Sequence, residues 1–247
     1  MAETLALLLF AHVLADFLLQ PTRMAKAKAA WHPGWMAAHI AVVGATALVA
    51  LGAQTAQAAA VVGGLTLAHL AIDTAKIVLA KYLPDAACFL LDQAAHLAAL
   101  LLVAGLVPQL WSVGVWAPCA PPWLPAVALL SAGAVLATRA GGFALAALMR
   151  PWGDVGLAGL PGGGRMIGML ERGIIFLLIL AGEPSGIGFL IAAKSVLRFG
   201  AVKEESRLSE YVIIGTLASF GWAMMVAIGA VMLLSALPPL GIPDLSP

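Results

Sequence analysis

Residues 4–20 read T-L-A-L-L-L-F-A-H-V-L-A-D-F-L-L-Q, an apolar run that contains one histidine, His12, and one aspartate, Asp16. A helix of roughly 20 mostly apolar residues crosses the hydrocarbon core of a bilayer, so this run predicts a membrane span. The whole chain is 62% hydrophobic and 10% charged, with a mean hydropathy of +1.02, which is far outside the balance of a soluble domain. The run lacks the basic start of a signal peptide, and we expect it to be a retained span.

Similar runs recur along the chain and predict an all-α, polytopic integral membrane protein with about eight transmembrane helices. The seventh run is short, and Gly186 and Gly188 near its start make a re-entrant segment the alternative to a full span. The expected helices cover residues 4–20, 35–52, 57–81, 86–107, 124–149, 166–182, 185–199 and 211–236.

Lysine and arginine residues gather at one set of alternate junctions between these runs, as is typical of cytoplasmic loops. The other junctions, 52–57, 108–123 and 182–184, contain neither residue. We therefore expect a protein of the bacterial inner membrane, surrounded by membrane lipid, with both termini outside. The net charge of +1 argues against nucleic acid as a partner. The positive junctions carry Arg23, Lys26, Lys28, Lys76, Lys81, Arg150, Arg165, Lys203 and Arg207.

A unit H-x3-D-x22-H occurs twice, with the copies 57 residues apart. The first copy is His12, Asp16 and His39, and the second is His69, Asp73 and His96. Copies that are two spans apart run in the same direction through the membrane, which predicts a duplicated helical hairpin. The sequence thus divides into a His/Asp bundle over 1–107, an outer loop over 108–123 and a C-terminal helical half over 124–247.

A spacing of four residues places histidine and aspartate on one helix face, one turn apart. The fourth run carries the same pair in reverse order, as Asp92 and His96, and this run also crosses the membrane in reverse. All the members are therefore expected at one depth, toward the cytoplasmic side. The predicted buried cluster contains His12, Asp16, His39, His69, Asp73, Asp92 and His96.

Charged groups inside a bilayer are expensive and are expected only where they are paired, hydrated or bound to an ion. Imidazole nitrogens and carboxylate oxygens bind zinc, manganese and iron, and seven such groups suffice for two ions. We expect one or two divalent ions, Zn or Mn, with His12, Asp16, His39, His69, Asp73 and His96 as metal ligands. Two alternatives stay open: a hydrogen-bond network without metal, and a bis-histidine haem, which leaves the carboxylates unexplained.

The second half carries another polar group near the cytoplasmic ends of its runs. Glu171, Arg172, Lys194 and Arg198 are expected there, and such a cationic cluster suits a phosphate or a lipid headgroup. We therefore regard these four residues as candidate substrate-binding residues. The alternative is that they pair with one another and with lipid phosphates nonspecifically.

Four motifs resemble those of an uncharacterised domain-of-unknown-function family of bacterial inner-membrane proteins. The motifs are H-V-L-A-D-F-L-L-Q at 12–20, D-Q-A-A-H at 92–96, I-G-M-L-E-R at 167–172 and F-L-I-A-A-K-S-V-L-R-F at 189–199. This resemblance implies no established activity. More loosely, the His/Asp pattern is similar to that of integral-membrane metal-dependent hydrolases and of cation-diffusion zinc transporters.

Two functions from different classes use the same cluster. A membrane-embedded metal-dependent hydrolase would act from the cytoplasmic side on a lipid-linked or phosphorylated substrate, with Asp92 as ligand or general base. A divalent-metal transporter, or a metal-binding membrane protein, would use the same ligands and a transporter would need a polar path to both faces. The outer halves of the first four runs are almost entirely apolar, which favours a one-sided site. A non-enzymatic assembly subunit with a structural polar network is the third hypothesis.

The orientation predicts that Cys119 lies outside and Cys88 near the cytoplasmic face, too far apart to form a disulfide. Treating whole cells with a membrane-impermeant thiol reagent should therefore modify Cys119 and spare Cys88, as read by mass spectrometry. Modification of Cys88 alone would show that the orientation is inverted.

Overall fold

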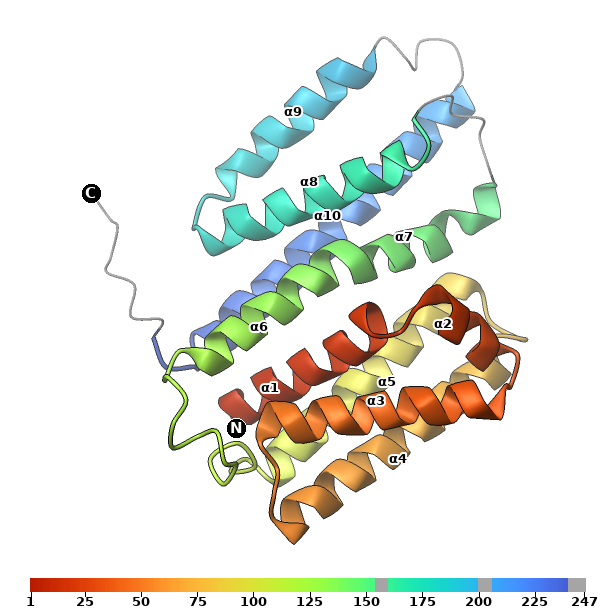
Figure 1. The fold of residues 1–247 in the computed structure, drawn as a ribbon. Helices are drawn as coiled ribbons and strands as arrows, with labels where there is room; N and C mark the ends of the chain where they lie inside the picture. The colour runs from red at the N-terminus through yellow and green to blue at the C-terminus, as the bar shows by residue number, and fades with distance from the viewer. Residues whose placement is uncertain (154–159, 200–205, 240–247) are drawn as a thin grey trace. The chain divides into compact units, whose positions relative to one another are not determined.

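The computed structural model describes residues 1–153, 160–199 and 206–239, and all regular elements in these ranges are helical. Figure 1 shows the helices in chain order. They are α1 (Ala2–Val13), α2 (Thr22–Ala29), α3 (Pro33–Leu51), α4 (Ala56–Leu79), α5 (Asp85–Leu106), α6 (Leu124–Val135), α7 (Gly141–Met149), α8 (Gly163–Leu180), α9 (Ser185–Phe199) and α10 (Ser206–Leu234). Two π-helical turns, Leu14–Leu18 and Leu136–Ala140, continue α1 and join α6 to α7, and a short 3-10 turn covers Arg150–Trp152.

Five helical segments in this part of the chain are long and apolar enough to cross a membrane, or six if the bent pair Ala2–Leu18 and Thr22–Ala29 counts as one span. This is the architecture of a helical membrane protein, whereas the expected eight spans are not confirmed. α8 is 18 residues long but contains Arg165, Glu171 and Arg172, and α9 has 15 residues. α2 was not expected from the sequence, and it is bent by 89° away from the preceding helical segment Ala2–Leu18.

Local signals fix the ends of the long helices. α3 begins at Pro33, and the preceding His32 caps it, because its Nδ1 accepts from the Trp35 backbone N–H at 3.4 Å. The helix ends at Leu51 and is followed by Gly52, whose φ of +60° lies in the left-handed region. α4 begins after Thr55, whose hydroxyl oxygen accepts from the Ala58 backbone N–H at 3.1 Å. The short connection between α3 and α4 makes these helices antiparallel neighbours.

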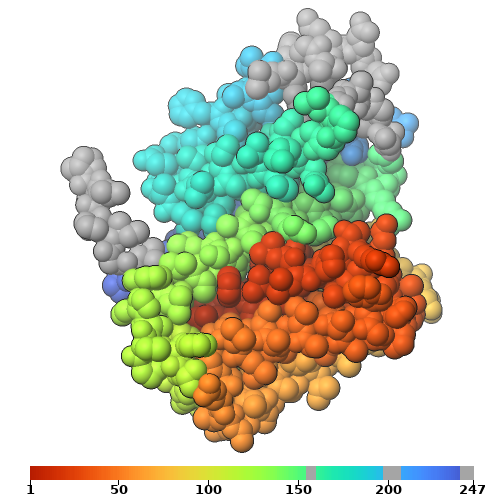
Figure 2. Space-filling model, viewed as in Figure 1, coloured from red at the N-terminus to blue at the C-terminus, as the bar shows by residue number. Residues whose placement is uncertain are grey.

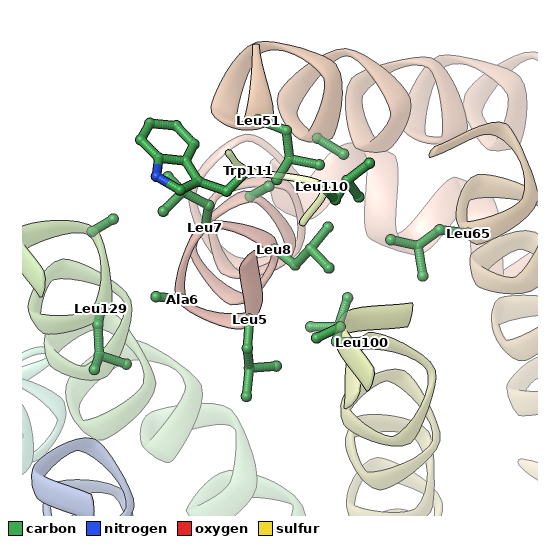
Figure 3. Close-up of a cluster of buried hydrophobic side chains, with 14 of the residues drawn as sticks. Leu5, Ala6, Leu7, Leu8, Leu51, Leu65, Leu100, Leu110, Trp111 and Leu129 are labelled. Carbon is green, nitrogen blue, oxygen red and sulfur yellow. The ribbon is translucent and has the colours of Figure 1, made fainter. Parts of the chain in front are cut away.

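The described residues form two compact units: 1–132 with 232–239, and 133–153 with 160–199 and 206–231. In the first unit, α1 packs against α3 and α5, and α4 packs against α3 and α5. Figure 2 shows side chains filling the gaps that the ribbon leaves between these helices. Figure 3 shows the apolar core of this unit, where Leu8, Leu65 and Leu100 project from α1, α4 and α5 into a shared interior.

The outer loop 108–123 is tied to the ends of α1 and α3. Thr4 donates its hydroxyl hydrogen to the Pro108 carbonyl at 2.7 Å and accepts from the Trp111 backbone N–H at 3.2 Å. Trp116 donates its indole N–H to the Val49 carbonyl at 2.7 Å. These bonds hold the loop against the first turn of α1 and the last turn of α3, so the loop is an ordered cap on the first unit.

Both cysteines are free thiols, with Cys88 buried in α5 and Cys119 exposed in the loop. Burial alone protects Cys88 from a reagent on either side of the membrane. The labelling experiment above therefore reports orientation through Cys119.

The second unit contains α7, α8, α9 and most of α10. Ile175 and Ile187 pack with Phe220 and Ala223, and this apolar contact joins α8, α9 and α10. Phe176, on the neighbouring position of α8, packs against Ala137 in the π-helical turn.

A close approach in the outer loop gives a stability prediction. A Cβ added at Gly114 would collide with the Leu51 carbonyl oxygen, whereas one added at Gly105 in α5 would meet nothing within 4 Å. Gly114→Ala should therefore destabilise the protein by about 1–3 kcal/mol, while Gly105→Ala should be neutral or stabilise it by up to about 1 kcal/mol. Thermal unfolding of the detergent-solubilised protein measures both, and equal melting temperatures for the two variants would contradict the close packing of the loop.

Candidate metal centre

The structure places all seven residues of the predicted cluster on facing sides of four helices of the first unit. α1 and its π-helical turn supply His12 and Asp16, α3 supplies His39, α4 supplies His69 and Asp73, and α5 supplies Asp92 and His96. His39 is fully buried, Asp16 is half-buried, and the other five residues are buried.

Each histidine extends the apolar core by one helical turn. Leu8 precedes His12 by four residues and Leu65 precedes His69 by four, while Leu100 follows His96 by four. Residues four apart share a helix face, so the faces that bury the leucines also bury the imidazoles. The polar cluster is therefore a continuation of the hydrophobic core of this unit.

Three ligand atoms form a nearly equilateral triangle. His39 Nε2 lies 3.1 Å from His69 Nε2, and Asp16 Oδ1 lies 3.3 Å from the first and 3.4 Å from the second. Ligands held at about 2.0–2.1 Å around a tetrahedral ion stand about 3.3–3.4 Å apart. The triangle thus has the edge length of one face of a zinc coordination tetrahedron.

The π-helical turn Leu14–Leu18 brings Asp16 into this triangle. The Leu19 backbone N–H donates to the Leu14 carbonyl at 2.8 Å, across five residues in place of four, which widens the helix where Asp16 sits. Such single turns are frequent at functional sites. His12 and Asp16 are consequently 4.0 Å apart, whereas His69 and Asp73, in an unbroken helix, approach to 3.6 Å. The equivalent positions of the two sequence copies therefore differ locally, and their superposition stays a prediction.

A second group of ligands lies where α4 faces α5. Asp92 Oδ1 is 3.5 Å from His96 Nε2, and Asp73 offers an oxygen within 4.8 Å of both residues. Asp73 Oδ2 also lies 3.6 Å from the Nε2 atoms of His39 and His69. Asp73 therefore borders both groups, as a carboxylate between two metal positions would.

The third grouping consists of stacked imidazoles beside a small cavity. The ring centroids of His69 and His96 are 4.1 Å apart, and those of His12 and His96 are 4.8 Å apart. The cavity that these rings line has a volume of about 20 Å³, otherwise bordered by apolar side chains, which is room for about one water molecule. A haem does not fit among rings this close, so the haem alternative has no support here.

Two lysines compensate carboxylates of the cluster. Lys28, on α2, donates to Asp73 Oδ2 at 2.5 Å, and Lys76 donates to Asp92 Oδ2 at 2.7 Å. Lys28 was interpreted from the sequence only as a marker of membrane orientation, and this role was missed. The signal in the sequence was that Met24 and Lys28 are four residues apart and so share one face of a short helix. In the structure this face is buried. The Lys76 side chain is 38% exposed, so it lies near the edge of the cluster.

Several polar atoms remain without a hydrogen-bond partner among the described residues: Asp16 Oδ1, Gln20 Nε2, His39 Nδ1, Asp92 Oδ1 and His96 Nε2. Buried polar atoms are nearly always satisfied, so each of these needs an explanation. Asp16 Oδ1, Asp92 Oδ1 and His96 Nε2 are of the types that bind metal ions, and their residues belong to the two groups above. The residues present therefore fit divalent metal. His39 Nδ1 departs from the usual pattern, because a metal-binding histidine normally donates from its second nitrogen.

The candidate substrate-binding residues lie in the second unit. Glu171 accepts from Lys194 at 2.8 Å, and Arg172 contacts the π-helical turn Leu136–Ala140 and Ser219. These three residues line one cavity, whereas the side chain of Arg198 lies outside the described residues. The structure thus brings three of the four together, in a unit separate from the His/Asp cluster.

The region that holds the His/Asp cluster also matches a known protein family. Residues 4–116 match the family described as protein of unknown function (DUF3307). The predicted resemblance to an uncharacterised family is thereby confirmed for this part of the chain. The DUF3307 segment includes all seven cluster residues, while the motifs at 167–172 and 189–199 lie beyond it. No curated protein and no solved structure matches the chain.

The Lys28–Asp73 pair generates a stability prediction. Lys28→Met should leave a buried carboxylate without its ammonium partner and lower the free energy of unfolding by up to about 3–5 kcal/mol. Lys26→Met removes an exposed charge from the same helix and should have little effect. Denaturation of both variants in detergent measures the difference, and equal stabilities would show that the pair contributes nothing.

Proposed function

We propose that the first unit is a membrane-embedded divalent-metal centre open to the cytoplasmic side, and that its metal serves a hydrolytic reaction. The observation that carries the proposal is the triangle of Asp16 Oδ1, His39 Nε2 and His69 Nε2, with edges of 3.1 to 3.4 Å. Asp16 Oδ1 is buried, and its neighbours in the triangle are two Nε2 atoms that also contact one another, an arrangement that a bound cation would hold together. A Zn or Mn ion is the species whose ligand chemistry fits this set.

A second ion is proposed at Asp92 and His96, with Asp73 between the two positions. The support is that Asp92 Oδ1 and His96 Nε2 are both buried, that neither makes a hydrogen bond within the described residues, and that they lie 3.5 Å apart. His12 borders the same imidazoles through its ring contact with His96, so it completes the ligand set or orients it. Lys28 and Lys76 form ion pairs with Asp73 and Asp92.

The proposed reaction is hydrolysis of a phosphorylated or lipid-linked substrate. Divalent metal at such a site supplies an activated water and stabilises charge on the oxygen under attack. The residues contribute a water-sized cavity beside His12, His69 and His96. Asp92 would act as a ligand of the second ion or, where it is not a ligand, as the general base. The apolar lining of that cavity excludes bulk water.

Transport through the cluster is the weaker candidate. A transporter needs polar groups toward both faces, yet the side chains beyond the histidines are Leu8, Val43, Ala47, Leu65 and Leu100. We therefore propose a one-sided site in a bacterial inner-membrane protein with both termini outside, in which α8 and α9 are the sixth and seventh of eight spans.

The metal content of the purified protein tests the proposal. Protein purified without chelator should carry one to two equivalents of Zn or Mn per chain, as measured by inductively coupled plasma mass spectrometry. Asp16→Asn and His69→Ala should each reduce that content by at least half, because each removes a corner of the triangle. His32→Ala should leave it unchanged, since His32 is the exposed fifth histidine and lies outside the cluster.

Two other outcomes of the metal analysis would separate the metal centre, the hydrolase and the structural network. Protein that carries no transition metal and gains none on titration would establish a structural polar network and remove the hydrolase proposal with it. Protein that binds metal but hydrolyses neither a phosphate monoester nor a phosphodiester probe in nanodiscs would keep the metal centre and overturn the proposed reaction.

A further inference from the structure

A cavity of 260 Å³ lies within the second unit, among α7, α8, α9 and α10. Its polar lining consists of Glu171 and Arg172 from α8, Lys194 from α9, and three hydroxyl side chains from α10, those of Tyr211, Thr216 and Ser219. Gly164, Gly168 and Gly215 line it as well, so it exists partly because no side chain fills these positions. None of these residues belongs to the metal centre.

Arg172 is the most constrained charge in this cavity. It is 3% exposed, and its guanidinium donates to the Ala137 carbonyl at 2.9 Å, the Thr138 carbonyl at 2.8 Å and the Ser219 hydroxyl at 3.1 Å. The π-helical turn Leu136–Ala140 makes these two carbonyls accessible, since its wider backbone leaves carbonyl groups outside the regular α-helical pattern. The arginine therefore braces α8 against this turn.

All three acceptors of Arg172 are neutral. A guanidinium has five N–H donors, so two remain beyond these three bonds. Among the described residues, no carboxylate forms an ion pair with it. The neighbouring Glu171 is engaged with Lys194 at 2.8 Å, and both of these side chains are nearly buried.

The charges that line the cavity thus sum to one net positive charge. Glu171 and Lys194 cancel one another, and the charge of Arg172 is left over. A buried charge without a counter-ion is strongly unfavourable, and it is more so among apolar helices. An anion in the cavity that borders Arg172 would supply the missing charge.

We propose that this cavity binds an anionic phosphate group, held by the Arg172 guanidinium and the Lys194 ammonium. Arginine and lysine are the side chains that bind phosphate oxygens, and the hydroxyls of Tyr211 and Thr216 add donors from a third helix. A tetrahedral phosphate has enough oxygens to accept from donors on α8, α9 and α10 together. The volume of 260 Å³ is below the range typical of sites for drug-sized ligands, so a headgroup or a free ion fits better than a large molecule.

Two sources supply the same chemistry, the headgroup of a phospholipid and free inorganic phosphate. The experiment separates them with full-length protein. In one arm, equilibrium dialysis of delipidated protein in detergent measures binding of radiolabelled inorganic phosphate. In the other, protein is incorporated in phosphatidylglycerol vesicles and re-extracted, and native mass spectrometry counts the phospholipid that remains bound.

Lys194→Gln is the primary variant. Loss of the ammonium leaves the Glu171 carboxylate beside Arg172, so the net charge of the cavity falls to zero and the affinity for phosphate should weaken about tenfold. Tyr211→Phe combined with Thr216→Val removes two donors with little change in volume, and it should also weaken binding if Lys194→Gln does not fold. Arg165→Gln is the matched control, because Arg165 is an exposed cation on α8 that does not line the cavity.

Each result decides between outcomes. Phosphate binding that weakens in Lys194→Gln and persists in Arg165→Gln supports the site with a free anion as its ligand. A retained phospholipid that is lost only in the cavity variants, with no binding of inorganic phosphate, supports a lipid headgroup. Binding of neither ligand, or equal binding by cavity variants and control, overturns the proposal. Because no metal is involved, the result is independent of the metal centre.

Discussion

Compensation of buried carboxylates is the constraint on which the first unit depends. Asp16, Asp73 and Asp92 project into a helical interior whose other residues are leucine, alanine and valine, so each requires a positive partner close by. Lys28 forms an ion pair with Asp73, and Lys76 forms one with Asp92. The neighbours of Asp16 are imidazoles. The helices are consequently held in one register, since a shift of α3 or α4 along its axis would leave a carboxylate in an apolar environment.

Departures from regular α-helix occur in both units at a polar group. The turn Leu14–Leu18 carries Asp16 to the imidazoles of His39 and His69, and the turn Leu136–Ala140 presents carbonyl oxygens to Arg172 and to the indole N–H of Trp222. The Gly141 backbone N–H also donates to the carbonyls of Leu136 and Thr138, so these oxygens accept a side-chain donor in addition to a backbone one. The widened turn departs from the regular hydrogen-bond pattern at the place where side chains of other helices supply further bonds.

The proposed metal centre and the proposed anion cavity differ in the side chains that they present. The first consists of imidazole nitrogens and carboxylate oxygens, and in the second the Arg172 guanidinium contacts neutral acceptors only. The first set would bind a cation and the second an anion. Hydrolysis of a phosphorylated substrate would use both kinds of site, but each is proposed here from the contacts of its own unit.

The sequence by itself determined the helical class, the bounds of the main helices to within a few residues, and the membership of the His/Asp cluster. These follow from local information: apolar run length sets a helix, and a spacing of four residues sets a shared face, as for His69 and Asp73. Only the tertiary structure decided that α2 is bent by 89° from the preceding helix, that Lys28 pairs with Asp73, and that Arg172 contacts neutral acceptors. The physical reason is that each of these depends on which side chain from a distant helix arrives at a buried charge, and residue spacing along one helix carries no information about that.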